Sequence, residues 1–438
     1  MDMAGREGRA WVGAALTGVL LAACGGTSLA PAAGSSPIAI TWLAGPITQD
    51  ANDPRQVLID AFEKAHPSIT VDLISGPTST DALRDTLRNR LTGAATAAAP
   101  DVYLGDLIWP AAFAHDGLAL PLSRYLPSDF WTRFVGGPGG GLVQGATYRG
   151  AIYAAPFFRD QGLLYYRRDL LQRAGMNVPT TWEQLAQEAA ALQAQGSVRY
   201  GFVWTAAPYE GLTCVWTELM SDAGGQVLNP AGTRSTIDSP ESLQALRFLR
   251  SLLASGVSPP DVATFQEPQV TAAFVGRQTA FARNWNSLYD VARTAGMQDL
   301  VGVAPLPTFA GHPGPGASTA GGWNLFVNPR TAHLQAALEF IRWMTDVDAQ
   351  EIMAGEYHDI PVNAVVQDES DLRSSSPVLG AVARTTVVPR PAGTPAYTAV
   401  SRAVYGNVSG VIQGRLRPED ALSAASAQID AALPRGSP

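Results

Sequence analysis

Aromatic residues stand beside small polar or charged residues at several places in this chain, each near the expected end of a strand. These clusters are Asp106-Leu107-Ile108-Trp109, Pro156-Phe157-Phe158-Arg159-Asp160, Pro208-Tyr209-Glu210-Gly211, Asn284-Trp285-Asn286 and Gly321-Gly322-Trp323-Asn324. Flat aromatic rings pack against the C–H faces of sugars, and Asp, Glu, Asn and Arg supply hydrogen-bond partners for hydroxyl groups. Ligands of open α/β sheets bind at the carboxyl ends of strands. The clusters therefore favour a sugar-binding site.

Each cluster also has a plain structural interpretation. Asp106 fits the cap of a following helix, and Glu210 fits a solvated helix N-terminus, where the helix dipole favours an acid. Trp285 and Trp323 fit core positions beneath loops, and Arg390 fits an ordinary loop residue. The coincidence of several clusters, rather than any single one, favours binding.

The motifs of common enzyme classes are absent from the sequence. It has no G-x-S-x-G, H-E-x-x-H, S-x-x-K or Walker A pattern, and no dinucleotide glycine fingerprint follows a strand. The glycine-rich run from Gly136 to Gly141 contains Pro138 and is interpreted as a surface loop. The histidines are scattered without ligand spacing. We therefore expect no catalytic residue, metal or cofactor, although carboxylate pairs distant in the chain stay open.

The N-terminus carries a short apolar run with a charged start. Arg6 and Arg9 precede this run, which is too short to span a bilayer, and Leu21-Ala22-Ala23-Cys24 follows it. These residues resemble a bacterial lipobox, in which the cysteine thiol takes a lipid and becomes the new N-terminus. We expect lipidation at Cys24 and an anchored domain on the extracytoplasmic face of the cell membrane. An ordinary secretory signal with a chance cysteine is the alternative.

Composition narrows the class of protein further. The formal net charge of −8 argues against nucleic acid, whose binding depends on neutralising phosphates. Cys214 is the only cysteine besides Cys24, which excludes a disulfide framework and predicts a small buried hydrophobe. The remaining length suits two lobes at roughly 100 to 200 residues per domain.

Hydrophobic periodicity predicts alternating strands and helices. Strands are expected at 38–43, 69–74 and 101–104 with helices between them, and this β-α-β-α-β order implies a parallel sheet with right-handed crossovers. Further on, Thr180 and Glu183 are expected to form a capping box at the start of a helix. The expected domains are a signal peptide over 1–23, a lipidated tether over 24–37, lobe 1 over 38–156 plus 285–330, and lobe 2 over 157–284 plus 331–438.

Several segments together resemble one known family. They are Ala61 to Pro67, Ala99 to Tyr103, Pro156 to Leu171, Pro179 to Glu183, Ala273 to Phe281 and Gly321 to Asn324. Over about residues 38 to 433 the chain resembles the solute-binding lipoproteins of ABC-type carbohydrate importers, within the cluster of maltose- and trehalose-binding proteins. The resemblance implies an α/β, two-lobed type II periplasmic-binding-protein fold with a hinge and an interlobe cleft.

Within that family the chain looks most like trehalose-binding lipoproteins. The resemblance implies ligand contacts at Asp106, Asp160, Glu210, Trp285, Gly322, Trp323 and Arg390. Gln49 stands in a loop where relatives often carry glutamate and is expected to serve as an amide donor, and Asp81 lies at a matching loop-to-helix position. Asp160 departs from the trehalose pattern, which has asparagine there, so the identity of the sugar stays open.

The expected function is capture of trehalose or a related α-linked disaccharide by a monomer, with delivery to the transmembrane permease subunits of an ABC importer. A binding protein for another solute, such as a polyol, a glycerophosphodiester, a peptide or an oligosaccharide, is the first alternative. An exported glycoside-processing enzyme on the same scaffold is the second. The acids at Asp106, Asp160 and Glu210 argue against an anionic solute.

Overall fold

The computed structural model describes residues 36–434 apart from 48–52, 313, 370 and 372–375. The expected lipidation site Cys24 and the expected contact Gln49 lie outside the described residues. Among the described residues, no helix has the length and apolar character needed to cross a bilayer.

A seven-stranded mixed sheet forms the first lobe. Its order is β12-β6-β11-β3-β1-β2, with β13 paired to β11. The strands are β1 (Ile38–Ala44), β2 (Ile69–Ser75), β3 (Val102–Asp106), β6 (Ala155–Gln161), β11 (Ala317–Val327), β12 (Ile360–Pro361) and β13 (Thr386–Val388). β1 pairs in parallel with both β2 and β3, which confirms the parallel sheet expected from the first three strands.

Alternating side chains of this sheet feed two separate cores, as a pleated strand buried on both faces requires. Trp42 packs with α1, α11 and α12 on one face, whereas its neighbour Leu43 packs with α2 and α3 on the other. The helices of this lobe are α1 (Pro54–Ala65), α2 (Thr80–Thr92), α3 (Pro110–His115), α4 (Gly141–Gly145), α11 (Leu334–Met344), α12 (Val347–Tyr357) and α13 (Ala364–Gln367). The short elements η1 (Leu122–Arg124), η2 (Ser128–Arg133), η3 (Gly137–Gly139), β4 (Thr147–Tyr148) and β5 (Ala151–Ile152) complete it.

A four-stranded sheet of order β10-β7-β9-β8 forms the second lobe. Its strands are β7 (Leu163–Arg167), β8 (Tyr200–Val203), β9 (Thr279–Asn284) and β10 (Val301–Ala304). Helices α6, α7, α8, α16 and α17 share the core on one face of this sheet, and α9, α10 and α15 share the core on the other. The helices are α5 (Arg168–Ala174), α6 (Trp182–Ala194), α7 (Glu210–Asp222), α8 (Pro240–Ala254), α9 (Glu267–Val275), α10 (Leu288–Thr294), α15 (Pro377–Val382), α16 (Tyr397–Ile412) and α17 (Pro418–Ala432), with η4 at Pro260–Thr264.

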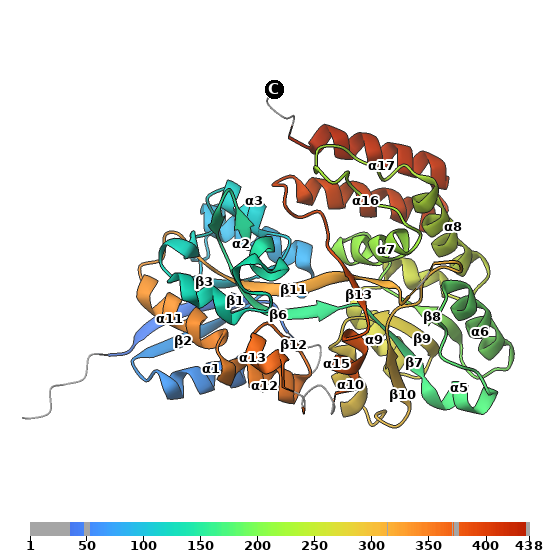
Figure 1. Ribbon diagram of the computed structural model, residues 1–438, viewed down its shortest axis with the longest axis horizontal. Coiled ribbons are helices and arrows are strands. Elements are labelled where there is room, and N and C mark those ends of the chain that lie inside the picture. The colour runs from blue at the N-terminus through green and yellow to red at the C-terminus, as the bar shows by residue number, and fades with distance from the viewer. Residues whose placement is uncertain (1–35, 48–52, 313, 370, 372–375, 435–438) are drawn as a thin grey trace, which may run out of the picture. The chain divides into compact units, whose positions relative to one another are not determined.

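Strands β6 and β11 run side by side between these two groups of elements (Figure 1). β6 continues directly into β7 of the second sheet, and β11 begins beside α7 and ends beside β3. The packing divides the chain differently from the expected boundaries. Residues 288–304 join the second sheet and its core, because β10 pairs with β7, whereas residues 334–357 join the core of the first sheet.

Two local expectations also differ from the structure. The capping box lies one residue further on than expected, since the Thr181 side chain accepts from the Gln184 backbone while Gln184 reaches back to Thr181. The run from Gly136 to Gly141, expected as a loop, instead forms η3 and starts α4. By contrast, Cys214 is buried within α7, as its apolar surroundings predicted.

Candidate functional site

A cavity of about 90 Å³ lies where the ends of the two sheets meet. Most of the expected contacts line it, namely Asp106, Asp160, Glu210, Trp285, Gly322, Trp323 and Arg390. Further lining residues that the sequence did not single out as contacts are Pro46, Ile47, Thr78, Thr80, Tyr209, Gly211, Cys214, Glu267, Ser287 and Gly321. The cavity, called the cleft below, therefore collects residues from the ends of β1, β3, β6 and β9 and from the middle of β11.

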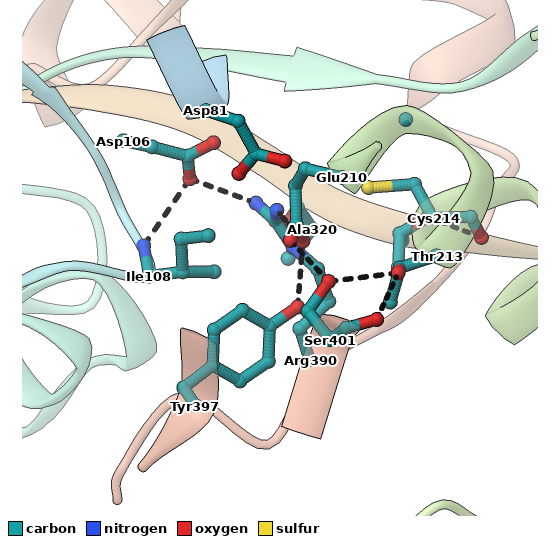
Figure 2. Close-up of polar contacts among 12 residues, drawn as sticks. Asp81, Asp106, Ile108, Glu210, Thr213, Cys214, Ala320, Arg390, Tyr397 and Ser401 are labelled. Carbon is teal, nitrogen blue, oxygen red and sulfur yellow. Dashed lines mark hydrogen bonds and ion pairs between the residues drawn. The ribbon is translucent and has the colours of Figure 1, made fainter. Parts of the chain in front are cut away.

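Arg390 joins the two acids that the sequence analysis paired with aromatic residues (Figure 2). Its Nη1 donates to Glu210 Oε1 at 2.7 Å, and its Nη2 donates to Asp106 Oδ1 at 3.0 Å. The three side chains are buried, so the guanidinium charge is shared between carboxylates with little water nearby. Burial raises the pKa of Asp106 and of Glu210, and Arg390 opposes that rise in both.

Glu210 occupies the first residue of α7, as the sequence suggested, but it is 3% exposed rather than solvated. Tyr397 donates its hydroxyl to Glu210 Oε1 at 2.6 Å, and Ser401 donates to Oε2 at 2.6 Å. Both partners lie on α16. Asp106 does not cap the following helix α3, whose N-cap residue is Trp109 without a side-chain cap; its Oδ1 instead accepts from the backbone of Ile108 at 3.2 Å, before the helix begins.

Trp285 follows β9, and the N–H edge of its ring is hydrogen-bonded to Glu267 of α9. Its Nε1 donates to Glu267 Oε1 at 3.2 Å, while the Tyr209 hydroxyl donates to Glu267 Oε2 at 2.5 Å. Glu267 begins α9 and was not among the expected contacts. Its position at a helix start and the nearby Phe265, two residues earlier, were the available signals. Tyr209 stood inside a recognised cluster but was not named as a contact.

Asp160 and Trp323 face the cleft from the paired strands β6 and β11. Register places Gly321 opposite Asp160 and Trp323 opposite Phe158. Burial raises the pKa of Asp160 to about 7, and the nearby charge of Asp106 adds to that rise. Gly322 has φ +136°, and a Cβ there would meet the Phe158 carbonyl oxygen at 2.5 Å, so the strand needs glycine at this position.

Asp81 is the one described residue of the expected set that does not line the cleft. Its Oδ1 accepts from Arg84 Nη1 at 2.8 Å near the start of α2. Burial is the main cause of the raised pKa of Asp106, and the charge of Asp81 adds to it, which agrees with their placement in Figure 2.

The arrangement offers hydrogen-bond donors, acceptors and aromatic rings rather than a reacting pair. Arg390 occupies both Asp106 and Glu210, so neither acid is free to work opposite the other as a general acid or base. Among the described residues, no group of three or more His, Cys, Asp or Glu side chains is arranged to hold a metal ion. The cleft thus presents polar groups and aromatic rings, with Asp106 and Glu210 already paired to Arg390.

Two lobes joined by β6 and β11, with a polar and aromatic cleft between their strand ends, define a two-lobed periplasmic-type binding protein. The chain belongs to the family of bacterial extracellular solute-binding proteins, whose model matches residues 45–351. The members compared with it are binding proteins rather than enzymes, and the family places the chain outside the cytoplasm.

Individual relatives agree with this assignment over most of the chain. A probable ABC transporter-binding protein of Deinococcus radiodurans is 31% identical over 380 residues, covering 84% of this chain and 87% of that protein. The maltose-bound MalE3 structure of T. maritima has a TM-score of 0.82 and 31% identity, and the match covers 90% of this chain and all of that one. The GacH receptor of Streptomyces glaucescens, with 22% identity and a TM-score of 0.79 over 91% and 99% of the two chains, shows the fold alone.

Proposed function

We propose that this protein is the sugar receptor of an ABC importer. In this role it captures an α-linked glucose disaccharide outside the cytoplasmic membrane and presents it to the permease subunits. The observation that carries the proposal is the cleft itself, in which Trp285 and Trp323 stand beside Asp106, Glu210 and Arg390. Rings that pack on sugar C–H faces and charged groups that bind hydroxyls occur together there.

The relatives support a sugar of this kind. The MalE3 structure, 31% identical to this chain, is described as maltose-bound. Trehalose is our first candidate and maltose-like glucosides are the second, because Asp106, Trp285 and Arg390 match the trehalose-binding pattern while Asp160 departs from it. The expected contacts are Asp106, Asp160, Glu210, Trp285, Gly322, Trp323 and Arg390, with Gln49 and Asp81 as further candidates from the sequence.

Binding is coupled to a hinge motion in this proposal. Ligand pockets commonly measure roughly 300 to 1,000 Å³, so a disaccharide needs more room than the cavity of about 90 Å³ provides. The lobes therefore separate to admit the sugar and close around it. A sugar favours the closed state only if it contacts both lobes, and Asp106 and Glu210 belong to different lobes.

Isothermal titration calorimetry of residues 37–438 tests the proposal directly. We expect a dissociation constant on the order of micromolar or tighter for trehalose or maltose, and much weaker binding of glucose. Asp160→Asn is the informative variant, because it restores the amide of the trehalose pattern and should raise the preference for trehalose over maltose. Arg417→Met, at an exposed ion pair with Asp420, is the matched control and should bind as the unchanged chain does. If titration detects no binding of any disaccharide, the proposed ligand is refuted.

A polyol receptor is the second candidate, favoured by the small volume of the cleft. An open-chain polyol exposes hydroxyls along its length but has no sugar ring to stack on Trp285 or Trp323. Titration with mannitol and ribitol separates the candidates. Tight polyol binding together with no response to disaccharides would replace the disaccharide proposal.

Anchoring through a lipid on Cys24 is proposed from the sequence alone. Mass spectrometry of the mature chain from membranes should find an N-terminal cysteine carrying diacylglycerol and no residues before it. A Cys24→Ala chain should leave the membrane fraction. A mature N-terminus elsewhere, without lipid, would support an ordinary secretory signal instead.

A further inference from the structure

An arginine side chain lies directly beneath the ring of Trp285. The Cζ atom of Arg283 is 4.1 Å from the ring centroid, and Arg283 is fully buried in the second lobe. Guanidinium groups stack on indole faces through their planar shape and positive charge. Arg283 thus covers one face of the ring and Glu267 holds its N–H edge, while the Trp285 side chain also lines the cleft.

The guanidinium is itself fixed in two directions by Glu218 of α7. Arg283 Nε donates to Glu218 Oε2 at 2.8 Å, and its Nη2 donates to Oε1 at 2.5 Å. Glu218 is also fully buried, and it raises the pKa of Arg283 against the lowering that burial alone would cause. A two-pronged arginine–carboxylate pair has a defined plane, so the ring above it is given a defined plane too.

The same carboxylate reaches one of the strands that connect the lobes. Glu218 Oε1 accepts from the Thr319 hydroxyl at 2.7 Å and from the Thr319 backbone at 3.1 Å, and Thr319 belongs to β11. Next to the pair, a Cβ on Gly162 would lie 2.3 Å from Arg283 Nη2 and 2.5 Å from Glu218 Oε1. Glycine between β6 and β7 therefore leaves the room that the pair occupies.

Arg283 has one buried donor, Nη1, without a hydrogen-bond partner among the described residues. The face of the indole ring is its electron-rich neighbour. A buried ion pair gives little net stability compared with apolar side chains of similar volume. A contribution to folding stability therefore does not explain why this ion pair lies under Trp285 and is hydrogen-bonded to β11.

We propose that Arg283 and Glu218 are positioning residues for ligand recognition. They set the plane of the Trp285 ring and link it to β11, so that the ring is held ready to stack on a sugar. The stacking part of this inference rests on the proposed sugar-binding function. The orientation of the ring by the ion pair does not.

The test removes both charges at once, because a single substitution would leave a buried charge without its partner. Arg283→Met with Glu218→Gln is the test chain. Arg167→Met with Asp169→Asn is the matched control. Arg167 also makes a two-pronged pair, donating to the two carboxylate oxygens of Asp169 at 2.7 and 2.8 Å. This pair lies at the start of α5, away from the cleft.

The first readout needs no ligand. The contribution of Trp285 to the near-ultraviolet circular dichroism spectrum is obtained by subtraction. The spectrum of a variant that also carries Trp285→Phe is subtracted from the spectrum of the same variant with Trp285. We expect this difference to collapse in the test chain and to persist in the control. An unchanged Trp285 contribution in the test chain would overturn the inference. Should the test chain fail to fold, Arg283→Lys keeps the charge, loses the planar stack and is expected to give the same result.

The second readout is a double-mutant cycle on sugar affinity. We expect the test substitutions to weaken binding by about tenfold when Trp285 is present and to cause no further loss in a Trp285→Ala background, because the pair acts through the ring. Equal losses in both backgrounds would refute action through Trp285. If the unchanged chain binds no sugar, the proposed function fails, and the circular dichroism result still decides the positioning role.

Discussion

Asp106 and Glu210 come from different lobes, and one guanidinium binds both of them. Arg390 donates to Glu210 at 2.7 Å and to Asp106 at 3.0 Å, in surroundings that exclude most water. Asp106 ends β3 of the first sheet, whereas Glu210 begins α7 on the core of the second. The proposed ligand site and a link between the lobes are therefore made by the same side chains.

Arg390→Met should weaken both folding and sugar binding. The substitution leaves two buried carboxylates without a cation, and breaking a buried ion pair commonly costs about 3 to 5 kcal/mol. Because protonation relieves the unpaired acids, the loss in the free energy of unfolding should shrink at low pH. Urea unfolding measures it, with Arg417→Met as a control at an exposed pair that should change nothing measurable. Equal effects of the two substitutions would contradict the buried bridge.

Asp160 should make stability depend on pH in a defined direction. Burial raises its folded-state pKa to about 7. In the unfolded chain the pKa of an aspartate is about 3.9, the value found in model peptides. The folded protein thus holds this proton to higher pH, and the contribution of Asp160 is full below about pH 4 and lost as the pH rises to about 7.

Asp160→Asn mimics the protonated side chain and should therefore stabilise the protein above pH 7. We expect a gain of about 1 to 3 kcal/mol at pH 8 and a clearly smaller one at pH 4.5, from the linkage between pKa and stability. Asp222, whose pKa burial also raises to about 7, is present in both chains and cancels in the comparison. A gain of the same size at both pH values would show that Asp160 titrates normally.

Gly321→Ala should weaken sugar binding more than it weakens folding. A Cβ at this position would lie 2.9 Å from Cζ3 of Trp285 and 3.0 Å from Cβ of Asp160, so the ring must move. We expect the dissociation constant to rise by about tenfold, from the loss of about 1.4 kcal/mol of binding energy. Gly393→Ala is the matched control, because no atom lies within 4 Å of its added Cβ. Calorimetry that finds the two variants alike would argue against Trp285 as a contact.

Thr181→Ala should destabilise the start of α6. Thr181 accepts from the Gln184 backbone at 3.1 Å, and loss of such a cap typically costs about 1 kcal/mol. Thr180→Ala, at the position expected from the sequence pattern, removes only an exposed side-chain bond to Gln184 and should cost less. Thermal unfolding of both variants compares the two positions. A larger loss from Thr180→Ala would favour the capping box one residue earlier.

Local patterns predicted most of the elements that carry the site. The sequence allowed us to infer strand ends at Asp106 and Asp160 and a helix start at Glu210. Hydrophobic periodicity and helix caps depend on residues that are close together in the sequence. Glu267 could not be found this way, since its partners Tyr209 and Trp285 are distant in the chain. The expected boundaries at residues 285 and 331 differ from the packing for a related reason: a strand or helix pattern does not state which sheet it joins.

The sequence by itself determined which side chains are available for recognition, because the types and local spacing of residues such as Asp106, Trp285 and Trp323 are fixed by the chain. It also determined most elements of the parallel part of the first sheet. Only the tertiary structure decided that Arg390 binds Asp106 and Glu210 together, that Glu267 holds Trp285, and that Arg283 with Glu218 lies beneath the ring. Those relationships depend on how sheets and helices pack over long separations in the chain, where burial and charge pairing, rather than local propensity, select the neighbours.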